Sequence, residues 1–242
     1  MKTKVAINGF GRIGRLAFRI AVKRKDIEIV GVNDLTDTDH LAYLLKHDSN
    51  YGAYDGTISF DDKNIIVDGV SIPVFAEKDT ELLPWGKLDV DVVIESTGHF
   101  TESLKARAHI KAGAKKVVIS ALGKGEGVDT VVLGANEDKL KDAGDIISNA
   151  SCTTNSIAAL MDIMDREFGI EKAMLTTVHS DTASQTLTDS PAKDRREGRA
   201  AAQNIVPTVT GAATAVAQVV PSMVGKFDGL SVRVPNPVVS LS

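Results

Sequence analysis

Cys152 is the only cysteine among 242 residues, and it stands where a helix is predicted to begin. Residues 146–149 indicate the end of a strand just before it. The apolar side chains that follow recur at helical spacing: Ile157, Leu160, Met161, Met164 and Phe168. A thiol in the first turn of a helix faces free backbone N–H groups, which favour the thiolate. The sequence therefore predicts a reactive thiol rather than a cysteine packed as a small apolar side chain.

Hydroxyl groups surround this cysteine, and one histidine is placed to act on it. The hydroxyls of Ser151, Thr153 and Thr154 suit the binding of an oxyanion or a phosphate. His179 ends a strand predicted over residues 173–178, the first strand after the cysteine helix, so we expect a Cys–His pair. The alternative is a structural histidine held by hydrogen bonds. The remaining histidines are expected at solvated positions in the first half of the chain: His40, His47, His99 and His109.

Two further features favour the binding of anions. Residues 208–211 (Thr-Val-Thr-Gly) open a helix predicted over residues 212–219, whose free N–H groups suit a phosphate, although a simple helix cap is the alternative. Arg233 lies in an otherwise apolar strand, where a guanidinium is costly unless it meets an anion. A basic cluster in the preceding loop is expected to be a solvated face: Arg195, Arg196 and Arg199.

A glycine motif near the start of the chain predicts a nucleotide site. Gly9, Gly11 and Gly14 form G-x-G-x-x-G between a short apolar strand (residues 4–8) and a helix reaching to about residue 24. Asp34 stands 20 residues after Gly14, at the end of the next predicted strand. This arrangement is the dinucleotide-binding fingerprint. We expect the apolar face of the helix to consist of Ile13, Leu16, Ala17 and Ile20.

Each part of the fingerprint has a predicted role. Gly9 permits the tight turn, Gly11 lets the backbone approach a pyrophosphate, and Gly14 lets the helix pack on the strand. Asp34 is expected to accept hydrogen bonds from the adenosine ribose and to repel a 2′-phosphate, which favours NAD over NADP. The alternative for Asp34 is a solvated loop aspartate. Thr97 and Gly98 follow a later strand, where they form either part of the ligand edge of the sheet or a simple turn.

The alternation of strands and helices predicts the fold class. A strand over residues 89–95, a helix over 103–112 and strands over 116–120 and 130–134 follow one another, with short β segments near residues 57–60 and 65–67. This pattern indicates an α/β protein with a doubly wound parallel sheet through about residue 150. Beyond this point the regular alternation of strands and helices ends, and no linker segment separates the two parts of the chain. We therefore expect two domains, residues 1–150 and an α+β domain over residues 151–242.

Composition restricts the class of protein. Hydrophobic residues make up 43% and charged residues 25% of the chain, which is typical of a globular domain, and the net charge is −4. Neither nucleic acid nor a membrane is therefore expected as the main partner. A single cysteine excludes an intrachain disulfide and fits a reducing compartment. Arg12, Arg15 and Arg19 interrupt the apolar run of a signal peptide, so we expect a cytoplasmic protein.

Seven segments, taken together, resemble the phosphorylating glyceraldehyde-3-phosphate dehydrogenase family. The most specific are the N-terminal INGFGRIGR and the ASCTTN around Cys152, and the match covers essentially the whole chain. The seven segments occur in family order at residues 6–14, 33–34, 47–49, 95–98, 150–155, 177–180 and 233–235.

The resemblance implies a Rossmann-type NAD-binding domain, followed by a catalytic domain, in an enzyme of glycolysis. Cys152 would attack the aldehyde of glyceraldehyde 3-phosphate to form a thiohemiacetal, and His179 would take its proton. Hydride would pass to NAD, and inorganic phosphate would cleave the resulting thioester. The residues implied in cofactor binding are Gly9, Phe10, Gly11, Arg12, Ile13, Gly14, Asp34, Ser96, Thr97, Gly98 and Ser120.

The resemblance also implies two phosphate sites and an assembly. By motif position the attacking phosphate would be held by Ser151, Thr153, Thr210 and Gly211. The substrate phosphate would be held by Thr182 and Arg233, with Arg196 nearby. The family forms homotetramers, and the loop over about residues 179–207 would pack at the subunit interface beside the neighbouring cofactor site.

The chain departs from the family pattern in two places. Asp181 replaces the usual aromatic residue, and its carboxylate is expected either to raise the pKa of Cys152 and repel phosphate or to point to solvent. The chain ends at Ser242, whereas the family continues the catalytic-domain sheet and adds a final helix. We therefore expect an incomplete catalytic domain whose residues 230–241 form an open apolar strand edge, which favours self-association. The alternative functions are a dehydrogenase of another phosphorylated aldose, such as erythrose 4-phosphate, or a catalytically impaired NAD-binding fragment.

Overall fold

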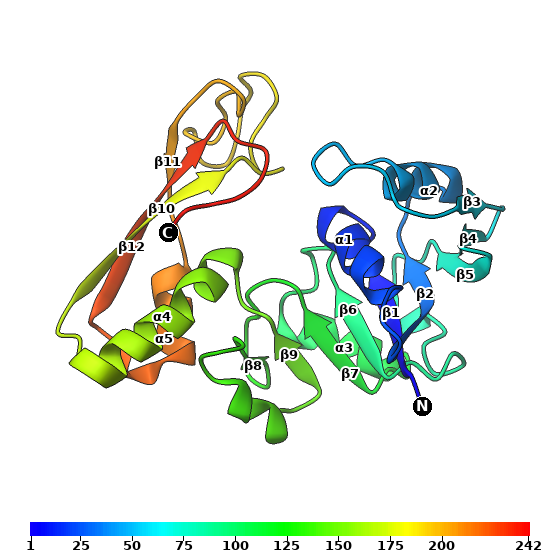
Figure 1. Cartoon of the computed structure of the whole chain (residues 1–242), viewed down its shortest axis with the longest axis horizontal. Helices are drawn as coiled ribbons and strands as arrows, with labels where there is room; N and C mark the ends of the chain where they lie inside the picture. Colours follow the sequence, from blue (N-terminus) through cyan, green and yellow to red (C-terminus); the bar gives the residue numbers. More distant parts are fainter. The chain divides into compact units, whose positions relative to one another are not determined.

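The computed structural model describes residues 1–242, which fall into two compact units (Figure 1). The first unit comprises residues 1–130 and 139–149, and the second comprises residues 131–138 and 150–242. The sequence placed a single junction at residue 150. The structure also assigns the short segment 131–138 to the second unit, where Val132 is part of the apolar core.

A largely parallel sheet forms the first unit, with its strands in the order β3–β4–β5–β2–β1–β6–β7–β9–β8. The strands are β1 (Thr3–Asn8), β2 (Ile27–Asn33), β3 (Ile58–Phe60), β4 (Asn64–Val67), β5 (Val70–Phe75), β6 (Val92–Glu95), β7 (Lys116–Ile119), β8 (Asp129–Thr130) and β9 (Ile146–Ser148). Strand β1 lies between β2 and β6, so the strand order reverses there, which creates a crevice beyond the strand ends. Only the β3–β4–β5 hairpins are antiparallel. This arrangement confirms the predicted doubly wound fold.

Helices cover both faces of this sheet. They are α1 (Arg12–Ala21), α2 (Thr38–Lys46) and α3 (Ser103–Lys111). A 3₁₀ turn lies at Thr80–Leu82, and a second one, Glu137–Lys141, spans the boundary between the two units. Successive residues of a strand point to opposite faces. Val5 and Ile7 accordingly join the core under α1 and α2, whereas Ala6 packs in a second core with Ala106 of α3.

The predicted apolar face of α1 is wrong for two of its four residues, while the other two, Leu16 and Ala17, are half-buried. Ile13 and Ile20 are 54% and 67% exposed, whereas Gly14 and Phe18 are buried. The rings of Phe18 and Phe10 meet edge to face, with centroids 5.3 Å apart. This contact, together with the close approach of Gly14 to the preceding turn, determines which side of α1 faces the sheet. Both sides of α1 carry apolar residues, so periodicity alone did not distinguish them.

The expectation for His109 is also wrong, because its side chain is completely buried rather than solvated. It lies on α3 and contacts Trp85 and Glu95, which are buried as well. The strand predicted over residues 130–134 is shorter, since β8 ends at Thr130 and the residues that follow belong to the second unit.

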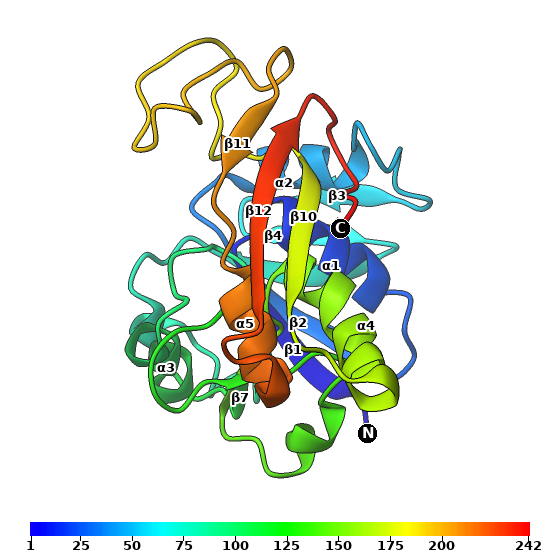
Figure 2. The ribbon, with the colours of Figure 1, turned by 90° about the vertical axis from the view of Figure 1, so that its left-hand side faces the viewer.

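The second unit packs two helices with a three-stranded sheet (Figure 2). The elements are α4 (Cys152–Phe168), β10 (Ala173–Ser180), β11 (Val206–Thr208), α5 (Ala212–Val219), a 3₁₀ turn (Pro221–Met223) and β12 (Phe227–Val234). Strand β12 pairs in parallel with β10 and antiparallel with β11. The predicted apolar face of α4 is only partly buried: Ile157 and Met161 lie in the core, whereas Leu160 and Phe168 are exposed.

The expectation that residues 230–241 form an open strand edge is wrong. Leu230 lies in β12, which is the middle strand and is paired on both sides. Residues 238–241 do not form a full strand. Instead Leu241 exchanges two backbone hydrogen bonds with Val178 of β10, at 2.8 and 2.9 Å.

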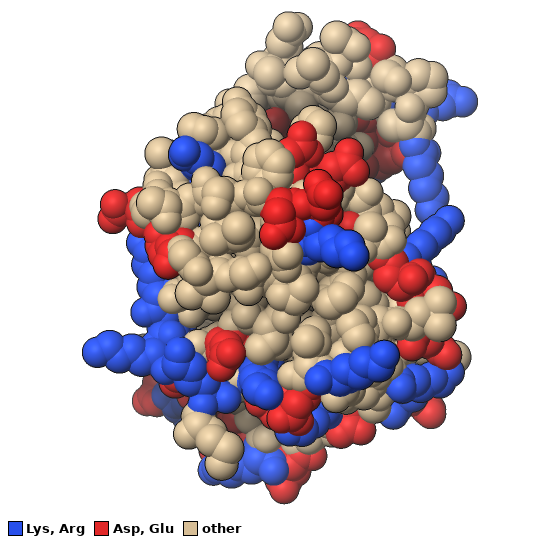
Figure 3. Space-filling model, turned by 90° about the vertical axis from the view of Figure 1, so that its right-hand side faces the viewer, with Lys and Arg blue, Asp and Glu red and all other residues tan.

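Charged side chains of both signs are interspersed over the face shown in Figure 3. The exposed ion pairs of the chain include Lys111 with Glu81 at 2.7 Å and Lys115 with Asp91 at 2.8 Å. Exposed pairs of this kind contribute little to stability. None of the helices has the length and apolar character that a membrane span requires.

Candidate active site and nucleotide pocket

Cys152 is the first residue of α4, as predicted, and its side chain is exposed. Ser151 caps the helix, because its hydroxyl oxygen accepts a hydrogen bond from the backbone N–H of Thr154 at 3.1 Å. Ala150 turns the chain into the helix with a φ of +58°, a conformation that non-glycine residues rarely adopt. The thiol is thus held at the positive end of the helix dipole.

The structure brings His179 to this thiol. His179 is the second-last residue of β10, and its Nε2 atom lies 3.2 Å from Sγ of Cys152. The imidazole is half-buried, while the sulfur remains accessible to a substrate. A nucleophile and a base within hydrogen-bond reach of each other are the arrangement that covalent catalysis requires.

Arg233 stands beside this pair. It is opposite His179 in the parallel register of β10 and β12, and its Nη1 atom lies 2.6 Å from Nδ1 of His179. The same Nδ1 lies 2.8 Å from the carbonyl oxygen of Ser180. Nδ1 therefore lies within reach of one acceptor, the Ser180 carbonyl, and of one donor, the Arg233 guanidinium. The imidazole can consequently be held either with or without a hydrogen on Nδ1. Sequence reasoning placed Arg233 at an anion site but missed its contact with the histidine.

The other predicted phosphate residues have partners of their own. The hydroxyl of Thr182 bonds that of Ser184 at 2.9 Å, and the hydroxyl oxygen of Thr210 accepts from the N–H of Ala212 in the first turn of α5. Gly211 is the N-cap of that helix, and Thr153 is buried in the first turn of α4. None of these residues has a hydrogen bond to the Cys–His pair.

Arg196 is engaged by a carboxylate. Its guanidinium forms two-point contacts with Asp194, the shortest being 2.6 Å, and holds the pKa of that carboxyl at about 2. Both side chains are at the surface. The structure thus matches the solvated basic face that the sequence predicted for the cluster, and Arg196 would have to leave Asp194 to meet a substrate phosphate.

Asp181 follows β10 directly. Its backbone N–H donates to the carbonyl of Asn236 at 3.0 Å, while its Oδ1 atom is buried without a hydrogen-bond partner. Of the two expected outcomes, the one in which the carboxylate simply points to solvent is therefore wrong. The carboxylate is half-buried at the end of the strand that carries His179.

A cavity of about 550 Å³ in the first unit lies at the predicted nucleotide edge. It opens beyond the carboxyl ends of β1, β2 and β6, where the strand order reverses. Its lining includes five residues that the sequence singled out: Gly9, Gly11, Asp34, Ser96 and Thr97. The others lie outside the lining: Phe10, Arg12, Ile13, Gly14, Gly98 and Ser120. Phe10 is a core residue, whose N–H donates to Asp34 at 2.7 Å.

The glycines of this cavity fit a bound pyrophosphate. A Cβ added at Gly11 would meet nothing within 4 Å, so the backbone there faces open space. A Cβ at Gly14 would lie 2.1 Å from the carbonyl oxygen of Gly9, which itself has a φ of +89°. Each oxygen of Asp34 accepts one backbone N–H, and carboxylate oxygens have further acceptor capacity for ribose hydroxyls. The residues present therefore fit NAD.

These glycines make a matched pair for mutation. Gly14→Ala is expected to lower the free energy of unfolding by about 3 kcal/mol or more, because backbone must move to admit the methyl group. Gly11→Ala should stay within about 1 kcal/mol of the parent, since there is space for the methyl, but should weaken NAD binding by about tenfold or more. Urea unfolding and calorimetry with NAD measure both effects. Equal stability losses for the two variants would contradict the packing role of Gly14.

Asp48 orients Arg12 beside this motif. Its carboxylate accepts from the Arg12 guanidinium and from the N–H groups of Asn50 and Tyr51, at 2.9 and 3.0 Å. Burial alone would raise the pKa of Asp48, but the hydrogen bonds of Tyr51, Asn50 and Arg12 together lower it to about 2. Because the folded-state pKa is depressed, the stabilisation is present above the unfolded value near 3.9 and is lost as the pH falls through about 2.

Asp48→Asn is therefore expected to destabilise the protein by about 1 kcal/mol or more at neutral pH. The difference in the free energy of unfolding between the variant and the parent should shrink as the pH falls from about 4 toward 2. Protonation of Asp48 then removes from the parent the same charge that the substitution removes. Urea unfolding of both proteins over this pH range measures it. Asp26→Asn, which breaks an exposed pair with Arg24, is the control and should cost little. If the difference in the free energy of unfolding between the parent and Asp48→Asn did not change with pH, the stabilising role of the Asp48 carboxylate would be contradicted.

Comparison with known proteins finds one family over both units of the chain. The NAD binding domain of glyceraldehyde 3-phosphate dehydrogenase matches residues 3–103, and the C-terminal domain of the same enzyme matches residues 151–242. Glyceraldehyde-3-phosphate dehydrogenase of Geobacillus stearothermophilus is 53% identical over 242 residues, which is all of this chain and 72% of that protein. The enzyme named glyceraldehyde-3-phosphate dehydrogenase 1 of Bacillus subtilis (strain 168) is 52% identical with the same coverage. Glyceraldehyde-3-phosphate dehydrogenase A of Escherichia coli (strain K12) is 52% identical over 243 residues, again covering 72% of that protein.

Proposed function

Because this chain belongs to the glyceraldehyde-3-phosphate dehydrogenase family, we propose that Cys152 and His179 are its nucleophile and base. The reaction is the NAD-dependent oxidative phosphorylation of glyceraldehyde 3-phosphate to 1,3-bisphosphoglycerate, a step of glycolysis. The observation that carries the two roles is the 3.2 Å contact between Sγ of Cys152 and Nε2 of His179 at the start of α4.

The chemistry follows from these two side chains. The Cys152 sulfur bonds the aldehyde carbon and gives a thiohemiacetal. NAD, when bound, supplies the acceptor for the hydride. His179 takes at Nε2 the proton that the thiohemiacetal hydroxyl loses, which leaves a thioester on Cys152. An oxygen of inorganic phosphate then attacks the thioester carbon, the C–S bond breaks, and the thiolate is restored.

Arg233 is proposed to hold the substrate phosphate together with Thr182. Because Arg233 also contacts His179, binding of this phosphate would change the hydrogen bonding of the imidazole. Arg233 reaches Nδ1 only as a donor, and a phosphate that draws its guanidinium away frees Nδ1 to donate to the Ser180 carbonyl, 2.8 Å distant. That bond suits the protonated ring. We assign the attacking phosphate to Ser151, Thr153, Thr210 and Gly211, and Arg196 to the surroundings of the substrate phosphate.

NAD is the cofactor, and the cavity of the first unit is its proposed site. Gly11 and the N-terminus of α1 are proposed to face the pyrophosphate, and Asp34 the adenosine ribose. Arg12 is held nearby by Asp48. The remaining cofactor contacts are assigned to the strand-end residues Ser96, Thr97, Gly98 and Ser120, and to Phe10 and Ile13 of the glycine motif. We propose residues 1–150 as the NAD-binding domain, apart from the segment 131–138, which belongs to the second unit, and residues 151–242 as the catalytic domain.

The proposed assembly is a homotetramer in the cytoplasm. The loop between β10 and β11 exposes apolar side chains, among them Leu187 and Ile205, which supports a role in subunit contacts. An exposed single thiol fits a reducing compartment. Light scattering tests the assembly, and a stable monomer would contradict it.

A turnover assay tests the function. NADH formation is measured with glyceraldehyde 3-phosphate, NAD and inorganic phosphate, and is expected to need all three. Erythrose 4-phosphate should be the poorer substrate. Faster oxidation of erythrose 4-phosphate would identify a dehydrogenase of another phosphorylated aldose. NAD binding without turnover on either aldehyde would identify a catalytically impaired NAD-binding protein instead.

A further inference from the structure

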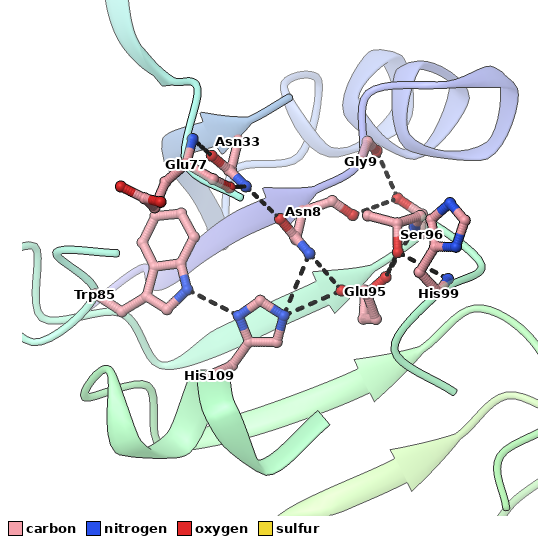
Figure 4. Close-up of polar contacts among 10 residues, drawn as sticks. Asn8, Gly9, Asn33, Glu77, Trp85, Glu95, Ser96, His99 and His109 are labelled. Atoms are coloured by element: carbon pink, nitrogen blue, oxygen red, sulfur yellow. Dashed lines mark hydrogen bonds and ion pairs between the residues drawn. The ribbon is translucent and has the colours of Figure 1, made fainter. Parts of the chain in front are cut away.

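A row of buried polar side chains crosses the ends of three strands of the first unit (Figure 4), and two of its members, Asn8 and Asn33, line the nucleotide cavity. Asn33, Asn8 and Glu95 are the last residues of β2, β1 and β6, three neighbouring parallel strands, and they lie opposite one another in register. His109 of α3 and Trp85 extend the row away from the cavity. All five side chains are at most 4% exposed. Such a row is stable only if its hydrogen bonds are satisfied.

The indole of Trp85 fixes the hydrogens of His109. Nε1 of Trp85 lies 3.1 Å from Nδ1 of His109, and an indole N–H can only donate. Nδ1 is therefore the acceptor, and the ring carries its hydrogen on Nε2. That hydrogen points to Oε2 of Glu95, 3.0 Å away.

Glu95 in turn fixes two parts of the cavity floor. Its Oε2 atom also accepts from Nδ2 of Asn8 at 2.5 Å, and its Oε1 atom accepts from the N–H of Thr97 at 2.8 Å and from the hydroxyl of Thr97. Four donors thus converge on a carboxylate that is 1% exposed. Asn8 and Thr97 both line the cavity.

The row continues to the opposite rim. Oδ1 of Asn8 accepts from Nδ2 of Asn33 at 2.7 Å, which fixes the direction of the Asn8 amide. Asn33 exchanges two hydrogen bonds with the backbone of Glu77, each 2.9 Å long. Glu77 and Asn33 are lining residues as well. Each hydrogen bond on this path from Trp85 to Glu77 therefore has one donor and one acceptor. Nδ2 of Asn8 also lies 3.4 Å from Nε2 of His109 (Figure 4), but with the His109 hydrogen on Nε2 both atoms are donors, so this contact is not a hydrogen bond of the row.

We propose that Glu95 and His109 are positioning residues for the dinucleotide, which set Asn8 and Thr97 in place on the cavity floor before the cofactor binds. This inference rests on the proposed assignment of the cavity to NAD. Neither residue lines the cavity, so both act through the side chains that do. A floor fixed in advance reduces the ordering that binding requires.

Because the donor and the acceptor of each hydrogen bond in the row are fixed, we expect that an amide cannot replace the Glu95 carboxylate. In Glu95→Gln the side-chain oxygen is needed by Thr97, so the NH₂ group faces two donors, Asn8 and His109. If His109 moves its hydrogen to Nδ1 to accept at Nε2, that hydrogen meets the indole N–H of Trp85. One hydrogen bond of the row is therefore lost whichever way the groups turn.

Two measurements on the full chain test the proposal. Nitrogen-15 NMR of the histidine side chains reports the hydrogen position of His109 in the parent protein, without any substitution. Calorimetry with NAD compares the parent, Glu95→Gln and Glu81→Gln. The last variant is the matched control, because Glu81 also contacts α3, through an exposed ion pair with Lys111. Circular dichroism checks that each variant is folded, and the rate of Cys152 alkylation checks that the second unit is unaffected.

We expect His109 to carry its hydrogen on Nε2, and Trp85→Phe, which removes the only donor to Nδ1, to give a mixture of the two forms. Glu95→Gln should bind NAD about tenfold more weakly or worse, with unchanged Cys152 alkylation, while Glu81→Gln binds as the parent. A hydrogen on Nδ1 in the parent, or NAD affinity of Glu95→Gln within about twofold of the parent, would overturn the proposal. If Glu95→Gln does not fold, the NMR result of the parent decides. Failure of the parent itself to bind NAD would instead refute the proposed function.

Discussion

Replacing Cys152 with serine is expected to reduce NADH formation by about a thousandfold or more, because a hydroxyl beside an imidazole is a far weaker nucleophile than a thiolate. The substitution exchanges one atom at an exposed position, so the fold should be unaffected. Labelling by iodoacetamide should disappear completely, since the chain has no other thiol. Steady-state turnover and intact-mass measurement after labelling test both statements.

His179→Gln is the companion variant. We expect turnover to fall by about a hundredfold to ten-thousandfold, because the proton acceptor 3.2 Å from Sγ is lost while the thiol remains. Iodoacetamide should still label Cys152, but more slowly at neutral pH. Normal turnover of Cys152→Ser would refute covalent catalysis at this position. Unchanged labelling kinetics in His179→Gln would refute the pairing of the two side chains.

Asp34→Asn is expected to narrow the preference for NAD over NADP. The parent should favour NAD by roughly a hundredfold, about 2–3 kcal/mol, because the 2′-phosphate of NADP would lie against the Asp34 carboxylate. The residues that follow, Leu35 and Thr36, bring no positive charge to offset this repulsion. Removing the carboxylate charge should reduce the ratio to about tenfold or less.

The control for this variant is Asp37→Asn, which removes a neighbouring exposed carboxylate outside the cavity lining. It should leave the ratio of the two affinities unchanged. Calorimetry with NAD and NADP on the three proteins gives the comparison. Comparable affinities of the parent for both cofactors would contradict the role of Asp34, and a loss of preference in Asp37→Asn would show that overall charge decides it.

The sequence by itself determined the features that depend on nearby residues. Cys152 begins α4 as predicted, because the polar residues before it and the apolar period after it specify a helix start locally. The roles of Gly9 and Gly14 were predictable for the same reason. A positive φ at Gly9 and a contact of 2.1 Å for a Cβ at Gly14 are consequences of one strand–turn–helix unit.

Only the tertiary structure decided the features that depend on residues far apart in the chain. His109 appeared to be a surface residue of α3, but it is buried by Trp85 and Glu95, which lie 24 and 14 residues away and supply its hydrogen bonds. The buried side of α1 was decided by the packing of Phe18 on Phe10, not by helical period. Arg233 meets His179 across 54 residues because β10 and β12 pair in parallel. Strand register and the pairing of buried donors with acceptors are properties of the assembled chain, so no local pattern in the sequence encodes them.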